Sequence, residues 1–163
     1  MKRGLSFADF NRRWFLALTA GSAAAAFVGL PSKSGHAQSG DVLTLDEAIA
    51  KAVGDKTVED AGGLVSLDLP QIAENGNTVP LGVSVDSPMT AEDRVMAVHI
   101  FADGNPRPEV ISFHFSAQSG LANASTRMRL AKTQNVIALA ELSDGRVLRA
   151  QSEVKVTIGG CGG

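Results

Sequence analysis

Hydrophobic residues first recur at a helical period between residues 44 and 54. They lie on one face of a predicted helix: Leu45, Ala48, Ile49 and Ala52. Thr44 and Glu47 have the spacing of a capping box, in which the threonine oxygen accepts from the Glu47 amide and the glutamate reaches back. Gly54 supplies a stop signal. The pattern therefore predicts one short helix over residues 45–53.

Beyond Gly63 the period changes to two, which is typical of strands. Seven runs rich in Val, Ile and Leu are separated by turn residues: 64–69, 78–85, 95–102, 109–116, 125–131, 136–142 and 146–158. Pro80 cannot donate a backbone hydrogen bond, so we expect the second run to be an edge strand. The stretch Ser143-Asp144-Gly145-Arg146 predicts a tight hairpin between the last two runs.

Seven short strands without a second helical block predict a mainly β fold. The expected architecture is an immunoglobulin-like antiparallel β-sandwich with a short N-terminal helix. The sequence has no Cys–Trp–Cys core pattern, so it leaves the strand order open. No linker divides residues 38–158, which we expect to form a single domain.

The first residues have the three parts of an export signal. Arg12 and Arg13 precede an apolar run over residues 16–30, and a small-x-small motif follows at residues 35–37. The two arginines match the twin-arginine variant, whose pathway carries folded proteins. A membrane anchor is the alternative, but this run is shorter than the ~20 residues that span a bilayer. We therefore expect residues 1–37 to be cleaved, leaving a periplasmic protein without membrane attachment.

The mature chain would be acidic and poor in aromatic residues. Beyond residue 37 it has ten basic and sixteen acidic side chains, a net charge of −6. A nucleic-acid partner is not expected, because binding to phosphates needs a basic surface. The aromatic residues of this part are Phe101, Phe113 and Phe115, which are too few for a base-stacking platform.

The segment VTIGGCGG, residues 156–163, places the single cysteine among four glycines. Glycine is costly to order and this segment has little to bury, so we expect residues 159–163 to be a disordered tail. One thiol cannot form an internal disulfide, so in an oxidising compartment Cys161 either cross-links to another chain or carries a group. No cation next to it in the sequence would activate it, so activation would come from a site that the tail enters. This describes a carrier arm consisting of Gly159, Gly160, Cys161, Gly162 and Gly163.

Two other kinds of site remain open as alternatives. His99 and His114 could bind a metal together with Cys161 and a methionine, although each histidine lies in a predicted strand and we interpret both as sheet-face residues. Two carboxylate pairs could supply an acid and a base, but they fall outside the predicted strands and suit solvated loops: Glu59-Asp60 and Glu92-Asp93.

The twin-arginine leader, the small β-rich domain and the terminal Gly-Gly-Cys-Gly-Gly together resemble the SoxY family, the sulfur carriers of the bacterial thiosulfate-oxidising (Sox) system. The resemblance spans the mature chain and is sharpest over residues 159–163. It implies that Cys161 is the covalent attachment site for sulfur intermediates, beginning with Cys–S–S–SO₃⁻. It also implies a protein that is not an enzyme and needs no cofactor of its own.

The same resemblance implies several partners. The carrier would form a heterodimer with a SoxZ-like subunit, which lacks a leader and would be exported with it. A c-type haem enzyme would load the cysteine, a dimanganese hydrolase would release sulfate, and in some organisms a sulfane dehydrogenase would oxidise the remaining sulfur. The alternatives are an exported β-sandwich module cross-linked through Cys161 and a periplasmic metalloprotein.

Overall fold

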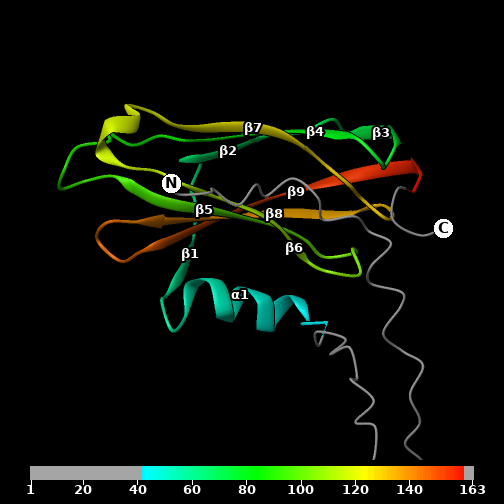
Figure 1. Ribbon diagram of the computed structural model, residues 1–163, viewed down its shortest axis with the longest axis horizontal. Coiled ribbons are helices and arrows are strands. Elements are labelled where there is room, and N and C mark those ends of the chain that lie inside the picture. The colour runs from blue at the N-terminus through cyan, green and yellow to red at the C-terminus, as the bar shows by residue number, and fades with distance from the viewer. Residues whose placement is uncertain (1–41, 160–163) are drawn as a thin grey trace, which may run out of the picture. The chain divides into compact units, whose positions relative to one another are not determined.

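The computed structural model describes residues 42–159, and Figure 1 shows the arrangement of their elements. In chain order these are α1 (Leu45–Val53), β1 (Val58–Asp60), β2 (Val65–Asp68), β3 (Ile72–Asn75), β4 (Val79–Val85), β5 (Val95–Ala102), β6 (Glu109–His114), the 3₁₀ turn η2 (Ala117–Ser119), β7 (Ala122–Met128), β8 (Gln134–Leu142) and β9 (Val147–Ile158). Within this range no helix is long and apolar enough to cross a bilayer.

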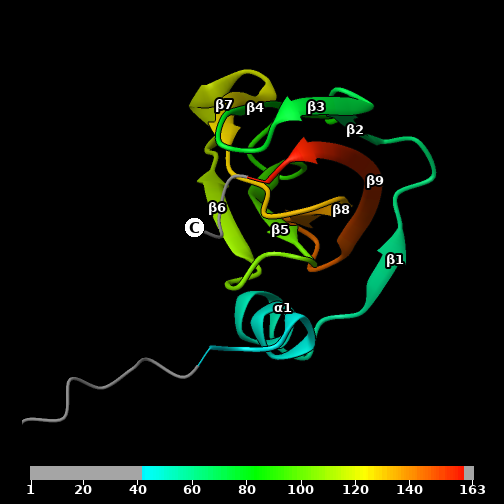
Figure 2. The same cartoon turned by 90° about the vertical axis from the view of Figure 1, so that its right-hand side faces the viewer.

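The strands form two sheets. The larger has the order β1-β9-β8-β5-β6, with β3 also paired to β9, and the smaller has the order β2-β4-β7. Figure 2 shows the smaller sheet on one side of the larger one and α1 on the opposite side. The predicted mainly β sandwich with one short helix is confirmed.

Apolar clusters cover both faces of the larger sheet, and this explains why its strands β5 and β8 are apolar along most of their length. Val98 and Ile100 of β5 pack into the main core between the sheets. Phe101 of the same strand, with Leu139 of β8, packs instead against α1. Because both faces are covered, β5 and β8 are nearly continuous apolar runs.

Helix α1 has the predicted bounds and the predicted cap. The Glu47 amide donates to Thr44 Oγ1 at 3.3 Å, and the Thr44 amide donates to Glu47 Oε2 at 2.8 Å. The Glu47 carboxylate accepts from the Thr44 amide and hydroxyl, and these two hydrogen bonds hold its pKa below the usual value. Ala48 and Val53 face the sheet and are buried, so the helix is fixed by its own ends and by the sheet.

The prediction that Pro80 marks an edge strand is wrong. Strand β4 lies in the middle of the smaller sheet, between β2 and β7. The proline is tolerated because β2 pairs only with residues 82–85 of β4, so Pro80 faces β7 alone, opposite Arg127.

Three further differences concern short or shifted strands. Glu59 and Asp60, interpreted above as loop residues, belong to β1, which pairs in parallel with the start of β9. Strand β3, which no pattern predicted, pairs in parallel with the end of β9. Strand β7 covers 122–128 instead of 125–131, because its partner β4 begins at Val79, opposite Met128.

Candidate functional site at the end of strand β9

Most of the predicted carrier arm lies outside the described residues. This holds for Gly160, Cys161, Gly162 and Gly163, and also for Arg12 and Arg13 of the leader. The structure defines the point from which the arm starts, which is Ile158 at the end of β9 and the following Gly159.

Backbone hydrogen bonds hold the end of β9 in place. Strand β3 runs beside it, with Asn75 opposite Ile158 (Figure 1). The Gly76 amide donates to the Ile158 carbonyl at 2.7 Å, and the Gly76 carbonyl accepts from the Leu130 amide at 2.8 Å. Gly76 thereby connects the end of β9 to the segment that follows β7.

Gly159 lies directly against the backbone of that same segment. A Cβ atom built on Gly159 would collide with the carbonyl oxygen of Ala131 and come within 3.2 Å of its carbonyl carbon. A side chain has no room at position 159. Gly159 was predicted to be part of a flexible tail, whereas it lies in close contact with the Ala131 backbone.

Asn105 fixes the segment around Ala131. Its Oδ1 accepts from the Ala131 amide at 2.9 Å and from Gln134 Nε2 at 3.0 Å, and its Nδ2 donates to the Arg129 carbonyl at 2.9 Å. The Gly-Asn-Pro stretch at residues 104–106 is typical of a turn, but nothing in it indicates hydrogen-bond partners more than twenty residues away.

The two histidines meet on the outer face of the larger sheet, beside α1. Their ring centroids are 6.2 Å apart and nearly perpendicular. His99 is buried, with Nδ1 2.7 Å from Ser112 Oγ and Nε2 3.4 Å from Glu141 Oε1. A carboxylate can only accept, so Nε2 carries the proton and Nδ1 accepts from the Ser112 hydroxyl.

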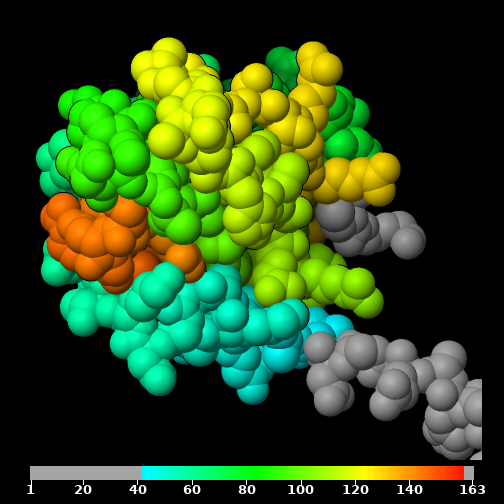
Figure 3. Space-filling view, turned by 60° about the vertical axis from the view of Figure 1, so that its left-hand side comes forward, coloured from blue at the N-terminus to red at the C-terminus, as the bar shows by residue number. Residues whose placement is uncertain are grey.

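This Ser–His–Glu arrangement is poorly suited to nucleophilic catalysis. Burial lowers the pKa of His99, against the opposing effect of Glu141, so the imidazole is a weaker base than usual. Lys56 Nζ lies 2.6 Å from Glu141 Oε2. This ion pair offsets the negative charge of Glu141, which would otherwise make His99 a stronger base. Figure 3 shows the orange turn between β8 and β9 next to the chain around the end of α1. We therefore interpret the cluster as structural.

The metal alternative gains no support from the described residues. Between residues 42 and 159, no three His, Cys, Asp or Glu side chains gather as a metal site would require. The set proposed above also includes Cys161, which lies outside this range.

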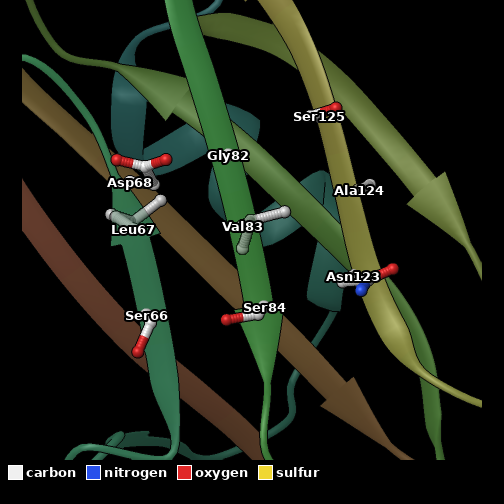
Figure 4. Close-up of a pocket in the computed structure, with 9 residues that line it drawn as sticks. All are labelled: Ser66, Leu67, Asp68, Gly82, Val83, Ser84, Asn123, Ala124 and Ser125. Atoms are coloured by element: carbon white, nitrogen blue, oxygen red, sulfur yellow. The ribbon is translucent and has the colours of Figure 1, made fainter.

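A shallow hollow lies on the outer face of the smaller sheet (Figure 4). It is lined from β2, β4 and β7 by Ser66, Leu67, Asp68, Gly82, Val83, Ser84, Asn123, Ala124 and Ser125. Asp68 is the one ionisable group in that lining. The hollow therefore lacks the pair of titratable groups that acid–base catalysis uses.

Comparison with known proteins favours the carrier arm over the other candidate sites. The sequence profile described as "Sulfur oxidation protein SoxY" matches residues 49–161, more than half of the chain, and so reaches Cys161. The chain belongs to the SoxY family. The resemblance noted in the sequence is thereby confirmed.

A solved SoxY structure supports the same conclusion. The sulfur carrier protein SoxY from Chlorobium limicola f thiosulfatophilum is 35% identical, with a TM-score of 0.60 over 71% of this chain and 97% of that one. No curated protein sequence gives a significant match.

Superoxide reductases share the fold of this SoxY chain. A variant of the neelaredoxin from Ignicoccus hospitalis is 19% identical, with a TM-score of 0.52 over 71% of this chain and 94% of that one. A putative superoxide reductase from Thermotoga maritima is 20% identical, with a TM-score of 0.52 over 62% and 93%. At this identity the likeness concerns the fold alone.

Proposed function

We propose that this protein is the sulfur carrier of a thiosulfate-oxidising system and that Cys161 is its covalent attachment site. The observation that carries the proposal is the family match, which extends to Cys161, the single cysteine of the chain. A carrier needs a nucleophilic sulfur that other proteins can reach, and a thiol flanked by glycines provides one without bulky neighbours.

The chemistry follows from the thiol. Oxidative coupling to thiosulfate forms a Cys–S–S–SO₃⁻ group, with loss of one proton and transfer of two electrons to a haem enzyme. Hydrolysis by a partner enzyme then releases sulfate and leaves a persulfide on the cysteine. The carrier itself contributes no cofactor and no catalytic group in this scheme. The buried, weakly basic His99 and its neutralised partner Glu141 agree with that role.

The proposal includes a place and a partner for the carrier. The twin-arginine leader favours export of the folded chain to the periplasm. SoxY membership implies a SoxZ-like partner within the Sox system. Docking of the haem enzyme, the dimanganese hydrolase and a sulfane dehydrogenase would then be transient, because each acts on the same cysteine in turn.

The test is Cys161→Ser in a reconstituted thiosulfate-oxidising system. Sulfate release should fall to background, because a hydroxyl cannot form the disulfide-type bond. The free energy of unfolding should change by less than about 0.5 kcal/mol, as for a surface substitution. Intact-mass spectrometry of the wild type should show thiosulfate-type additions that a reductant removes.

A misplaced thiol provides the control. Adding Ser125→Cys to the Cys161→Ser variant puts a thiol on the exposed face in Figure 4, and it should not restore turnover. Thiosulfate oxidation by Cys161→Ser alone would refute the proposal. A stoichiometric protein disulfide as the only adduct would favour the cross-linked module instead.

A further inference from the structure

We infer that Gly159 is held in a fixed position at the point where the carrier arm leaves the domain, and we call it the anchor of the arm. Asn105 is a positioning residue that holds the backbone around Ala131, against which Gly159 packs. The inference rests on the proposed function, because it concerns how Cys161 is presented to partner enzymes. It differs from a simple flexible arm, in which all four glycines would serve the same purpose.

The constraint at Gly159 is steric contact and not backbone conformation. Its φ is not among the positive values found at Gly54, Gly62, Gly63, Gly120 and Gly145. Backbone torsion alone would thus permit an L-amino acid. What excludes a side chain is the Ala131 carbonyl, whose oxygen occupies the direction in which Cβ would project. The obstacle is backbone, so it cannot rotate away as the end of a side chain could.

Asn105 holds the Ala131 carbonyl in position through hydrogen bonds to the neighbouring backbone. The carboxamide of Asn105 binds the Ala131 amide and the Arg129 carbonyl, each at 2.9 Å, and so clamps two alternate residues of the segment. Gln134, only 5% exposed, supports that carboxamide with Nε2 and accepts from the Gly104 amide at 2.7 Å with Oε1. A partly buried network of paired polar groups of this kind fixes the segment in one arrangement.

The end of β9, which leads to Gly159, is also held in position by hydrogen bonds. The Ile158 carbonyl accepts from Gly76, and the Val156 amide donates to Thr133 Oγ1 at 3.0 Å. Thr133 belongs to the connection between β7 and β8, and Gly76 is bonded to Leu130 of the same connection. The arm therefore starts from a defined point in a defined direction.

The anchor limits where the thiol can be. Only Gly160 stands between Gly159 and Cys161, so the two Cα atoms are at most about 7 Å apart. Such a short tether presents the cysteine within a small volume next to the 129–134 connection. A docked enzyme then meets the thiol near one place on the carrier.

The test compares Gly159→Ala with Gly160→Ala in the full mature chain. Both add one methyl group to the same segment, so a general loss of flexibility affects them alike. The anchor predicts that kcat for sulfate release falls about tenfold or more in Gly159→Ala, because a misplacement near 1 Å costs up to about 100-fold. The KM for the carrier should change less than about twofold, since the docking surface is intact. Gly160→Ala should keep kcat within about twofold. Equal kcat values for the two variants would overturn the anchor.

Asn105 is tested in the same assay. Asn105→Ala should lower kcat more than it raises KM, and Asn105→Asp, which keeps both acceptor contacts, should recover part of the loss. Asn123→Ala, an exposed asparagine on β7, is the matched control and should behave as the wild type. Urea unfolding checks that every variant is folded. Wild-type kcat in Asn105→Ala would remove Asn105 from the inference.

A second measurement does not depend on sulfur transfer. In ¹⁵N relaxation of the wild-type chain, the heteronuclear NOE of Gly159 should match that of Ile158, and it should fall in Asn105→Ala. A Gly159 value far below that of Ile158 in the wild type contradicts the anchor, whatever the variants do. Failure of the proposed function would appear separately, as sulfate release by Cys161→Ser.

Discussion

His99 shows at the scale of one residue how this fold treats a polar group within a sheet. It is only 9% exposed, and both ring nitrogens have partners, Ser112 on β6 and Glu141 on β8. Lys56 in turn pairs with Glu141, so a chain of four polar side chains crosses three neighbouring strands. The cluster satisfies its own hydrogen bonds and ties the edge strand β6 to the centre of the sheet.

The lowered pKa of His99 makes stability depend on pH. Burial disfavours the imidazolium in the folded chain, so the unfolded chain takes up the proton more readily. The free energy of unfolding should be highest above pH of about 6.5 and should decrease as the pH falls through the lower folded pKa. Urea unfolding between pH 7.5 and pH 5 measures this, and His99→Gln should flatten the dependence. His114→Gln, which leaves His99 buried, should retain most of it. An unchanged slope in His99→Gln would contradict the assignment.

At the scale of elements, β5 shows how one strand serves two clusters. Its bounds and its apolar run were predictable, because the residues themselves carry the signal. Phe101, 2% exposed, packs against α1, while Met96 on the same strand is 41% exposed. Their different surroundings could not be predicted, because they depend on where α1 packs and where β6 ends.

Phe101→Ala should therefore destabilise the protein by about 3–5 kcal/mol, since it leaves a cavity between α1 and the sheet. Met96→Ala removes a similar apolar side chain from the same strand and should cost less than about 1 kcal/mol. Urea unfolding followed by far-UV circular dichroism gives both values. Equal losses for the two variants would show that α1 does not seal a separate cluster.

Local signals explain which elements the sequence could predict. Helix α1 was found to the residue because Thr44, Glu47 and Gly54 mark its ends within the segment itself. Strands β1 and β3 were missed because they are three and four residues long and exist through pairing with the distant β9. Asn105 was missed for the same reason, since its partners come from the segment after β7. Long-range contacts leave no periodic pattern in the sequence.

At the scale of the whole molecule, the two sheets and α1 pack into one folded body within the described residues. The two apolar clusters lie on opposite faces of the larger sheet. We propose that this body crosses the membrane already folded, by the twin-arginine pathway, together with its bound subunit.

Replacing Arg12 and Arg13 with lysine tests this proposal. The variant should stay in the cytoplasm with its leader uncleaved, and the SoxZ-like subunit should disappear from the periplasm with it. Immunoblots of cell fractions measure both proteins, and N-terminal sequencing of the exported wild type should begin at Gln38. Normal periplasmic levels of the subunit without its carrier would contradict joint export.

Strand β9 has a consequence for how the domain is made. It pairs with β8, β1 and β3, so the first short strand has no neighbour in its sheet until residues 147–158 have been synthesised. The contact order is correspondingly high, and closure of long loops slows folding to milliseconds or longer. Until β9 has been synthesised, β1 and β3 have no partner strand and β8 has an unpaired edge. Unpaired strand edges favour aggregation. The segment that ends in the sulfur-bearing arm is thus also the one that completes the sheet.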